Sequence, residues 1–371
     1  MRQVFINGRY LTQAVTGVQR CAIETVRALD LLVAQGEYVG QGWSFTVLVP
    51  PSLRVHPTFA RLPVRVVGWG RGQLWEQVEL PIHARRGLLL SLANVAPIAV
   101  RHQCVTIHDA SVFAVPHAYR LVFRTWYRFL IPTLGRRAER ILTDSRFSRD
   151  ELIHKAGIPA AKLAVVPLAG EHILSVPADN GVFRRHQLGS RPYLVTVGSD
   201  APHKNLGSLA RAVELVPQKD YDVVMAGGRN ATVFGNDPSE SAGRIRRLGY
   251  VTDGELRALY EQATCLVFPS LYEGFGLPAL EAMACGCPVI ASDAASLPEV
   301  CGDAALYCDA RDPRDIAARI SDVLTRPELR QDLSARARAR AGGFRWTATA
   351  RAVMAEIEGV VRGPDPMAPS R

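Results

Sequence analysis

Two carboxylates that lie eight positions apart, Glu273 and Glu281, occur in the segment LYEGFGLPALEAMACGCPVIAS at residues 271–292. An ionised carboxylate only accepts hydrogen bonds, so each one suits the hydroxyl groups of a ribose or a sugar better than a phosphate. Glu273 is predicted on a loop and Glu281 inside a helix, which gives the two side chains different roles. The alternative is structural: Glu281 favours an early helical turn and Glu273 is solvated.

The elements around these carboxylates predict an anion site. Residues 265–268 read as a short apolar strand, and Pro278 favours the first turn of a helix that runs to Met283. The loop between them carries Gly274 and Gly276, which let a ligand approach the backbone closely. Because a helix N-terminus carries about half a positive charge, this loop is predicted to bind a phosphate.

One lysine, Lys204, follows a predicted strand at residues 193–197, in the run GSDAPHKNL at residues 198–206. Only four lysines accompany forty arginines in the chain, and a compact ammonium group suits an oxygen of a diphosphate. We therefore predict that Lys204 contacts a phosphate. An ordinary surface lysine is the alternative.

In the first half of the chain, Thr106-Ile107-His108-Asp109 ends a predicted strand, where ligands usually meet an open α/β sheet. A histidine can hydrogen-bond a sugar hydroxyl without losing a proton. His108 is therefore a predicted sugar contact, with Asp109 either orienting it or binding an acceptor, and a structural histidine is the alternative. Gly17 opens another predicted helix and would let a substrate approach the backbone, although a simple loop glycine explains it equally well.

Strand and helix patterns alternate along the whole chain, which favours parallel sheets covered by helices on both faces. The break at residues 170–190 reads as a linker between two domains, predicted at 1–178 and 179–345. Residues 346–371 follow as a helix and a disordered tail that begins at Gly363. The predicted strands are 4–6, 45–49, 64–67, 88–92, 105–107, 141–143 and 164–166, then 193–197, 222–226, 265–268, 289–291 and 305–307.

Length and composition agree with a two-domain enzyme kept in the cytoplasm. The chain has 371 residues, which suits two cores better than one. It contains no apolar run of transmembrane length, and its N-terminus leads directly into a predicted strand instead of a signal sequence. The seven cysteines are an odd number spread through strand and helix patterns, which predicts buried thiols in a reducing compartment.

The excess positive charge lies in the first half of the chain. Residues 1–180 hold 21 basic and 12 acidic residues, a net charge of +9, and the remainder is neutral. Arg120, Arg124 and Arg128 recur at helical spacing in an amphipathic segment that is predicted to end at Pro132. They predict contact with an anionic membrane surface, and the alternative is that the apolar face of this helix packs on its own sheet. No nucleic-acid-binding motif accompanies the charge, so nucleic-acid binding is not expected.

The segment from Glu273 to Glu281 resembles the Glu-x7-Glu signature of the retaining glycosyltransferases with the GT-B fold, in the group 1 family that contains bacterial mannosyltransferases. The resemblance is strongest over residues 193–310 and looser over the first 170 residues. It implies two Rossmann-like domains facing across a cleft, the N-terminal one binding the acceptor and the C-terminal one the nucleotide sugar, with the helix from Trp346 to Val361 returning to the first domain. It also implies transfer of a sugar, mannose first, from a nucleotide-diphosphate sugar to a hydroxyl of a glycan or lipid-linked acceptor. It implies no metal and no cofactor.

The same resemblance implies roles for individual residues. Glu273 would hold the transferred sugar, Glu281 the ribose, and Lys204 with the backbone amides of residues 274–277 the diphosphate. His108 and Asp109 would complete the catalytic set. His203 and Ser199 stand where the family often has basic residues. This departure argues against two cationic side chains binding the diphosphate together. The donor-binding residues implied are Gly17, Ser199, His203, Lys204, Asn205, Tyr250, Val251, Glu273, Gly274, Phe275, Gly276, Leu277 and Glu281.

Other functional classes remain open from the sequence. The donor sugar is alternatively rhamnose or glucose. A sugar phosphorylase shares the architecture but would need pyridoxal phosphate. A dehydrogenase fits the α/β pattern, yet no G-x-G-x-x-G follows the first strand. A non-catalytic protein that binds a nucleotide sugar or a membrane surface would use the same charged residues without turnover.

Overall fold

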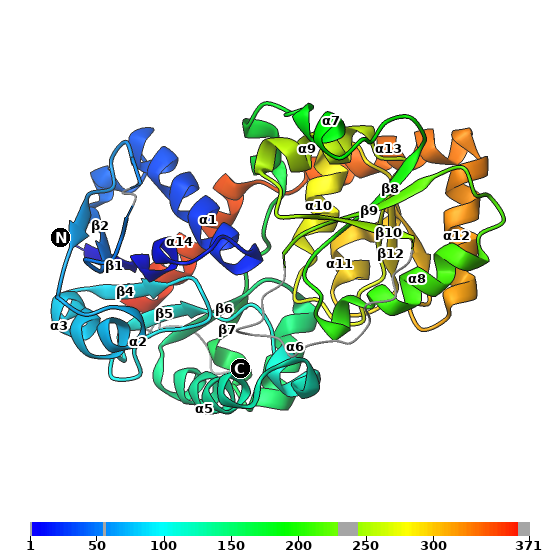
Figure 1. Cartoon of the computed structure of the whole chain (residues 1–371). Helices are drawn as coiled ribbons and strands as arrows, with labels where there is room; N and C mark the ends of the chain where they lie inside the picture. The colour runs from blue at the N-terminus through cyan, green and yellow to red at the C-terminus, as the bar shows by residue number, and fades with distance from the viewer. Residues whose placement is uncertain (1, 55–56, 229–243, 363–371) are drawn as a thin grey trace. The chain divides into compact units, whose positions relative to one another are not determined.

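The computed structural model describes residues 2–54, 57–228 and 244–362, and their contacts divide the chain into two compact units (Figure 1). Unit 1 comprises residues 1–110 and 126–168 together with the chain from Trp346 onward. Unit 2 comprises residues 111–125 and 169–345. The predicted tail from Gly363 lies outside the described residues.

Unit 1 contains a sheet of seven parallel strands in the order β3-β2-β1-β4-β5-β6-β7. Its central strands are buried along their whole length, as expected for a parallel sheet with both faces covered. The strands are β1 (Arg2–Asn7), β2 (Trp43–Val49), β3 (Val64–Val66), β4 (Leu88–Ser91), β5 (Gln103–Thr106), β6 (Arg140–Thr143) and β7 (Leu163–Val165).

Helices cover both faces of this sheet. The helices α1 (Gly17–Ala34) and α14 (Trp346–Arg362) lie side by side on one face (Figure 1). On the other face, Trp75 and Leu80 pack with Phe5 of β1, Leu48 of β2 and Leu89 of β4. The remaining helices along this part of the chain are α2 (Gly72–Leu74), the π-helical turn η3 (Trp75–Glu79), α3 (Leu80–Ala84), α4 (Ser111–Ala114), α5 (Leu121–Arg137) and α6 (Arg146–Ala156).

Unit 2 contains a sheet of six parallel strands in the order β10-β9-β8-β11-β12-β13. Its core joins β8, β9 and β11 to helices α8, α12 and α13. The strands are β8 (Tyr193–Val197), β9 (Asp222–Ala226), β10 (Ile245–Gly249), β11 (Cys265–Phe268), β12 (Val289–Ser292) and β13 (Ala305–Cys308). The helices are α7 (Gly181–Arg185), α8 (Leu206–Leu215), α9 (Asp253–Gln262), α10 (Leu277–Ala284), α11 (Leu297–Cys301), α12 (Pro313–Thr325) and α13 (Pro327–Gly342).

The twelve predicted strands are confirmed, and β10 is an additional strand that the sequence did not predict. It lies at the sheet edge and exposes Arg246 and Arg247, so its pattern is too polar to read as a strand. All seven cysteines are buried and none is in a disulfide, as predicted. Over the residues described, no helix is both long and apolar enough to span a bilayer.

Two sequence interpretations are corrected. Helix α5 does not end at Pro132 but continues to Arg137. Proline removes one backbone donor, and the Thr133 hydroxyl donates to the Phe129 carbonyl at the same turn (2.7 Å). The predicted linker at 170–190 is not a free connection, because it forms the short helix η6 (Glu171–Ser175) and α7, both of which pack on α9 of unit 2.

Candidate functional site

The loop that carries Glu273 is built by a strand, a left-handed glycine and a helix start, as predicted. Strand β11 ends at Phe268, and α10 begins after Gly276, which has a φ of 97°. A Cβ added at Gly276 would lie 2.5 Å from Cδ2 of Leu297, so both conformation and space require glycine there. The Ser296 hydroxyl donates to the Glu273 carbonyl (3.0 Å), which holds the loop in place.

Lys204 and Glu273 form an ion pair, with 2.6 Å between Nζ and Oε1. The two side chains are only 18% and 11% exposed, so solvent screens the pair weakly. The ammonium group also lies 5.5 Å from the centre of the Phe268 ring. Gly198 lies beneath the lysine stem, since a Cβ there would be 3.5 Å from Lys204 Cδ. The structure therefore brings together the predicted phosphate contact and the predicted sugar contact.

Glu281 lies on α10 in a separate, buried group of contacts. Its Oε1 is 3.0 Å from Nε2 of His172, and its Oε2 accepts from the Tyr260 hydroxyl (3.3 Å). Burial raises the pKa of Tyr260 well above its usual value, and the nearby Glu281 charge adds to the shift, so the phenol stays protonated and donates. Gly170 packs against α10, where a Cβ would lie 2.8 Å from the Leu280 carbonyl. Both oxygens of Glu281 are thus engaged by its own unit.

The other predicted donor residues of unit 2 are placed differently. Asn205 ties two loops together, because its side-chain amide donates to the carbonyls of Pro269 (3.1 Å) and Ala310 (2.6 Å). His203 is buried and stacks on Tyr119, with 6.5 Å between ring centres. Ser199 and Val251 are half-buried and Tyr250 is 72% exposed, just after β10. Gly274 and Phe275 are buried in the loop that carries Glu273, and Leu277 is buried at the start of α10.

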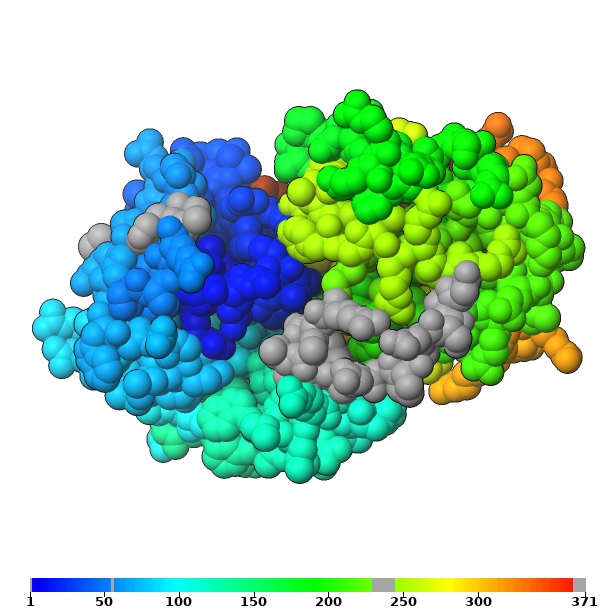
Figure 2. Space-filling model, viewed as in Figure 1, coloured from blue at the N-terminus to red at the C-terminus, as the bar shows by residue number. Residues whose placement is uncertain are grey.

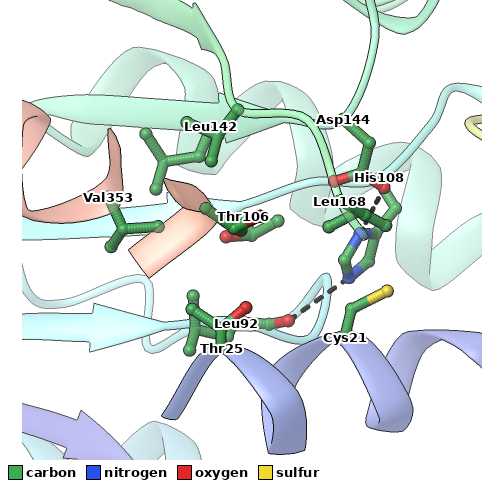
Figure 3. A pocket seen from close by; sticks show the side chains of 11 residues that line it. Cys21, Thr25, Leu92, Thr106, His108, Leu142, Asp144, Leu168 and Val353 are labelled. Carbon is green, nitrogen blue, oxygen red and sulfur yellow. Dashed lines mark hydrogen bonds and ion pairs between the residues drawn. The ribbon is translucent and has the colours of Figure 1, made fainter. Parts of the chain in front are cut away.

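His108 belongs to unit 1 and forms a buried pair with Asp144 (Figure 3). Its Nδ1 lies 2.7 Å from Asp144 Oδ2, and its Nε2 lies 3.2 Å from the Leu92 carbonyl. Its backbone amide donates to the side chain of Asn94 (2.8 Å). The pocket beside the ring is also lined by Cys21 and has room for about one water molecule, far too little for a hexose.

The surroundings of His108 favour a protonated ring. Burial disfavours the charge, but the carboxylate of Asp144, its hydrogen bond, and the nearby Asp109 outweigh burial and raise the pKa of His108. Both ring nitrogens face acceptor atoms, so each needs a proton to make a hydrogen bond. The carboxylate that orients His108 is therefore Asp144 and not Asp109.

Gly17 is exposed at the start of α1, and a Cβ there would meet no atom within 4 Å. The helix start is instead held by a capping box between Thr16 and Gln19. Nothing in the described residues requires glycine at this position, so its predicted substrate role gains no support from packing.

Three residues of these clusters were missed from the sequence: Asp144, His172 and Tyr260. Asp144 follows β6 in the run Thr143-Asp144-Ser145, a strand end next to the one that carries His108, which is the signal that was available. His172 lies in the segment taken as a linker, and Tyr260 lies on α9 far from Glu281 in sequence. No local pattern relates either of them to Glu281.

Comparison with known proteins identifies the family. The model of the family described as glycosyl transferases group 1 matches residues 182–340. The O-antigen chain mannosyltransferase B of Escherichia coli is 37% identical over 262 residues, which cover 67% of this chain and 68% of the relative. The chain belongs to the glycosyl transferases group 1 family.

Further comparisons extend over almost the whole chain. The O-antigen chain mannosyltransferase RfbU of Salmonella typhimurium is 26% identical, covering 88% of this chain and 92% of the relative. The structure of Anabaena HepE in complex with UDP and glucose has a TM-score of 0.73 at 16% identity, covering 96% and 99% of the two chains. The structure of WaaG, a glycosyltransferase involved in lipopolysaccharide biosynthesis, has a TM-score of 0.68 at 14% identity, covering 96% and 100%. These similarities show the GT-B fold.

The chain is thus a glycosyltransferase, an enzyme, and not a dehydrogenase. Lys204, Glu273 and Glu281 lie within the residues that match the family. His108, Asp144 and His172 lie outside that match, so their placement comes from the structure alone.

Proposed function

We propose that this glycosyltransferase transfers mannose, with retention, from GDP-mannose to a hydroxyl of a glycan or lipid-linked acceptor in bacterial surface polysaccharide synthesis. The observation that supports the donor proposal is the Lys204–Glu273 ion pair, whose carboxylate lies on the loop that leads into α10. An ammonium group, a helix N-terminus and a carboxylate then face phosphate and sugar together. The choice of mannose follows the named activities of the O-antigen mannosyltransferases that resemble the chain. Rhamnose and glucose are the alternative sugars.

In this proposal, catalysis depends on positioning and electrostatics and needs no protein nucleophile. Lys204 and the amides of residues 274–277 stabilise the departing diphosphate, and the leaving phosphate accepts the proton of the attacking hydroxyl. Glu273 exchanges its contact with Lys204 for hydroxyls of the transferred sugar. Glu281, oriented by His172 and Tyr260, binds the ribose. No metal or cofactor is required.

In this proposal His108 contacts the sugar and Asp109 beside it binds the acceptor. Because the pocket beside the ring has room for about one water molecule, this contact requires the ring to leave the Leu92 carbonyl. The Nε2 atom of His108 is the one that turns to the sugar, because its 3.2 Å contact to the Leu92 carbonyl is the longer of the two ring contacts. Asp144 holds the other nitrogen during that turn. Ser199, His203, Tyr250 and Val251 line the nucleotide in this proposal.

We also propose that the enzyme works in the cytoplasm at an anionic membrane surface. Arg120 and Arg128 are exposed, and Val122 and Phe129 on the same helix are 83% and 58% exposed, so the apolar residues of α5 are not all packed on the sheet. Leu74, Val78 and Ile82 of unit 1 are also exposed. They belong to the segment labelled α2 and α3 in Figure 1, which lies at the surface in the same view of Figure 2. Exposed apolar side chains beside arginines are typical of interfacial binding.

A thermal-shift screen without metal tests the donor proposal, using GDP, UDP, dTDP and ADP with their sugars. A ligand at tenfold its dissociation constant adds about 1.4 kcal/mol of stability. We expect a shift with GDP-mannose that Glu281→Ala abolishes, whereas Glu273→Ala retains binding and loses turnover. If no nucleotide sugar shifts the melting temperature at millimolar concentration, the donor proposal is wrong.

A further inference from the structure

A buried polar cluster in unit 1, apart from the pocket of His108, joins Asn7, Arg9 and Glu76. The Asn7 side-chain amide donates to Glu76 Oε1 (2.7 Å) and to the Ser91 hydroxyl (3.2 Å). The Arg9 Nε lies 2.9 Å from Glu76 Oε2. These side chains come from the residues at the ends of β1 and β4 and from the turn η3. Three distant parts of the sequence thus meet at one point.

That point is where parallel α/β sheets usually bind ligands. Strands β1 and β4 are neighbours, and the chain leaves β1 toward β2 and β3 on one side and continues from β4 toward β5 on the other. Ligands of open parallel sheets bind outside the carboxyl ends of the strands at such a switch in strand order. Asn7 ends β1, Ser91 ends β4, and Arg9 follows β1 by two residues.

The turn that carries Glu76 is held rigidly. The Trp75 indole donates to the Val67 carbonyl (2.8 Å), and Glu79 accepts from the amides of Trp69 (2.7 Å) and Gly70 (2.9 Å). Gln77 bonds to the backbone of residues 96 and 98. Such π-helical turns are rare and recur at functional sites. Trp75, Gln77 and Glu79 therefore fix the turn that carries Glu76.

The cluster keeps unused hydrogen-bonding capacity. Glu76 is 1% exposed, and although Oε2 lies within ion-pair distance of Arg9, it makes no hydrogen bond of good geometry among the described residues. Burial raises the pKa of Glu76, and Arg9 and Asn7 offset this only in part. Within the described part of the chain, the only ion pair of Arg9 is made through Nε, so its two terminal nitrogens are left to donate elsewhere.

We propose that Arg9, positioned by Glu76 and Asn7, binds the hydroxyl groups of the acceptor sugar. This rests on the proposed transferase function and adds the acceptor subsite to it. The two terminal nitrogens of Arg9 offer neighbouring donors, and the oxygens of adjacent sugar hydroxyls accept hydrogen bonds from them. Arg9 contacts the sugar, whereas Glu76 and Asn7 are positioning residues.

The charge of the cluster selects a neutral sugar over a phosphate. Arg9 is already paired with the Glu76 carboxylate, so the site carries little net charge. An incoming phosphate would be repelled by that nearby carboxylate, whereas a neutral sugar would not. We therefore expect inorganic phosphate not to compete with the sugar.

Saturation-transfer NMR with α-mannotriose and no donor tests the subsite directly. Wild-type protein should show binding, and Arg9→Ala should weaken it by about tenfold or more, the size expected for losing hydrogen bonds to a charged group. Glu76→Gln should weaken it less. Arg65→Ala, an exposed arginine on β3 of the same unit, should bind as wild type.

Further measurements separate binding from folding and from the donor site. All variants should keep the wild-type melting shift with GDP-mannose, because Lys204, Glu273 and Glu281 lie in unit 2 and none of them is changed. If Arg9→Ala does not fold, Arg9→Lys replaces it, since lysine keeps the charge but not the fork. The proposal is overturned if wild type does not bind mannotriose, if the Arg9 variants bind it as wild type does, or if phosphate displaces it. An absent donor shift with retained, Arg9-dependent mannotriose binding would instead count against the proposed transferase function alone.

Discussion

The Lys204–Glu273 pair makes a prediction that distinguishes a poised catalytic pair from a surface ion pair. The perturbations are Lys204→Met, Glu273→Gln and the double variant, with Lys219→Met as a control at an exposed lysine of the same unit. If the pair is ready to bind a donor, the Glu273 carboxylate is paired with the Lys204 ammonium group until the diphosphate of the donor takes the place of the carboxylate. The two single variants should then change nucleotide binding in opposite directions.

The magnitude follows from the geometry. At 2.6 Å and an effective dielectric constant of about 20, the Coulomb attraction is roughly 6 kcal/mol. Residual exposure of 18% and 11% lets solvent and the cost of desolvation offset most of this, which leaves a coupling of about 1–2 kcal/mol in the free energy of unfolding. Loss of one donor to the leaving group costs roughly 3 kcal/mol, or about 100-fold in turnover.

Urea unfolding of the four proteins measures the coupling, and calorimetric titration with GDP measures nucleotide binding. We expect Lys204→Met to weaken GDP binding and turnover strongly. Glu273→Gln should bind GDP more tightly than wild type, because a competing carboxylate is gone, and yet lose turnover. If Glu273→Gln and Lys204→Met weaken GDP binding equally, or if the coupling is zero, the reasoning is refuted. Lys219→Met should match wild type in GDP binding and turnover; it is not a control for unfolding, because its Nζ donates to the carbonyls of Glu214 (2.9 Å) and Val216 (2.6 Å).

Two further predictions concern the protonation of His108 and membrane binding. His108 should hold its proton above pH 6.5, because Asp144 and the Leu92 carbonyl outweigh burial. Because the pKa of His108 is higher in the folded than in the unfolded protein, its protonation stabilises the fold fully below pH 6.5, and this stabilisation is lost as the pH rises through the folded pKa. Unfolding titrations of Asp144→Asn should lack that loss. A His108 pKa below 6.5, measured by NMR in the wild type, would contradict the prediction. In flotation assays, the wild type should bind phosphatidylglycerol vesicles and not phosphatidylcholine vesicles. The double variants Arg120→Gln/Arg128→Gln and Val78→Ser/Ile82→Ser should each weaken this binding. If the wild type does not float with the anionic vesicles, the membrane proposal is wrong.

Local patterns were sufficient for most of the fold. Parallel strands buried on both faces are nearly continuous apolar runs, so β4 and β11 could be recognised without any knowledge of their neighbours. The edge strand β10 was missed because an edge exposes its side chains and loses that signal. Pro132 wrongly predicted a helix end. A proline is tolerated inside α5 because the residues before and after it, Leu130 and Leu134 among them, are buried.

For the site, the sequence by itself determined the loop that carries Glu273 and the helix that carries Glu281. A strand, a glycine turn, a proline and two glutamates are all local features within residues 265–284. Only the tertiary structure decided which groups these residues meet: Lys204 at Glu273, His172 and Tyr260 at Glu281, Asp144 at His108, and Glu76 at Arg9. Each of these pairs joins residues from separate elements. The order of strands in a sheet brings such residues together, and no spacing along the chain encodes that order.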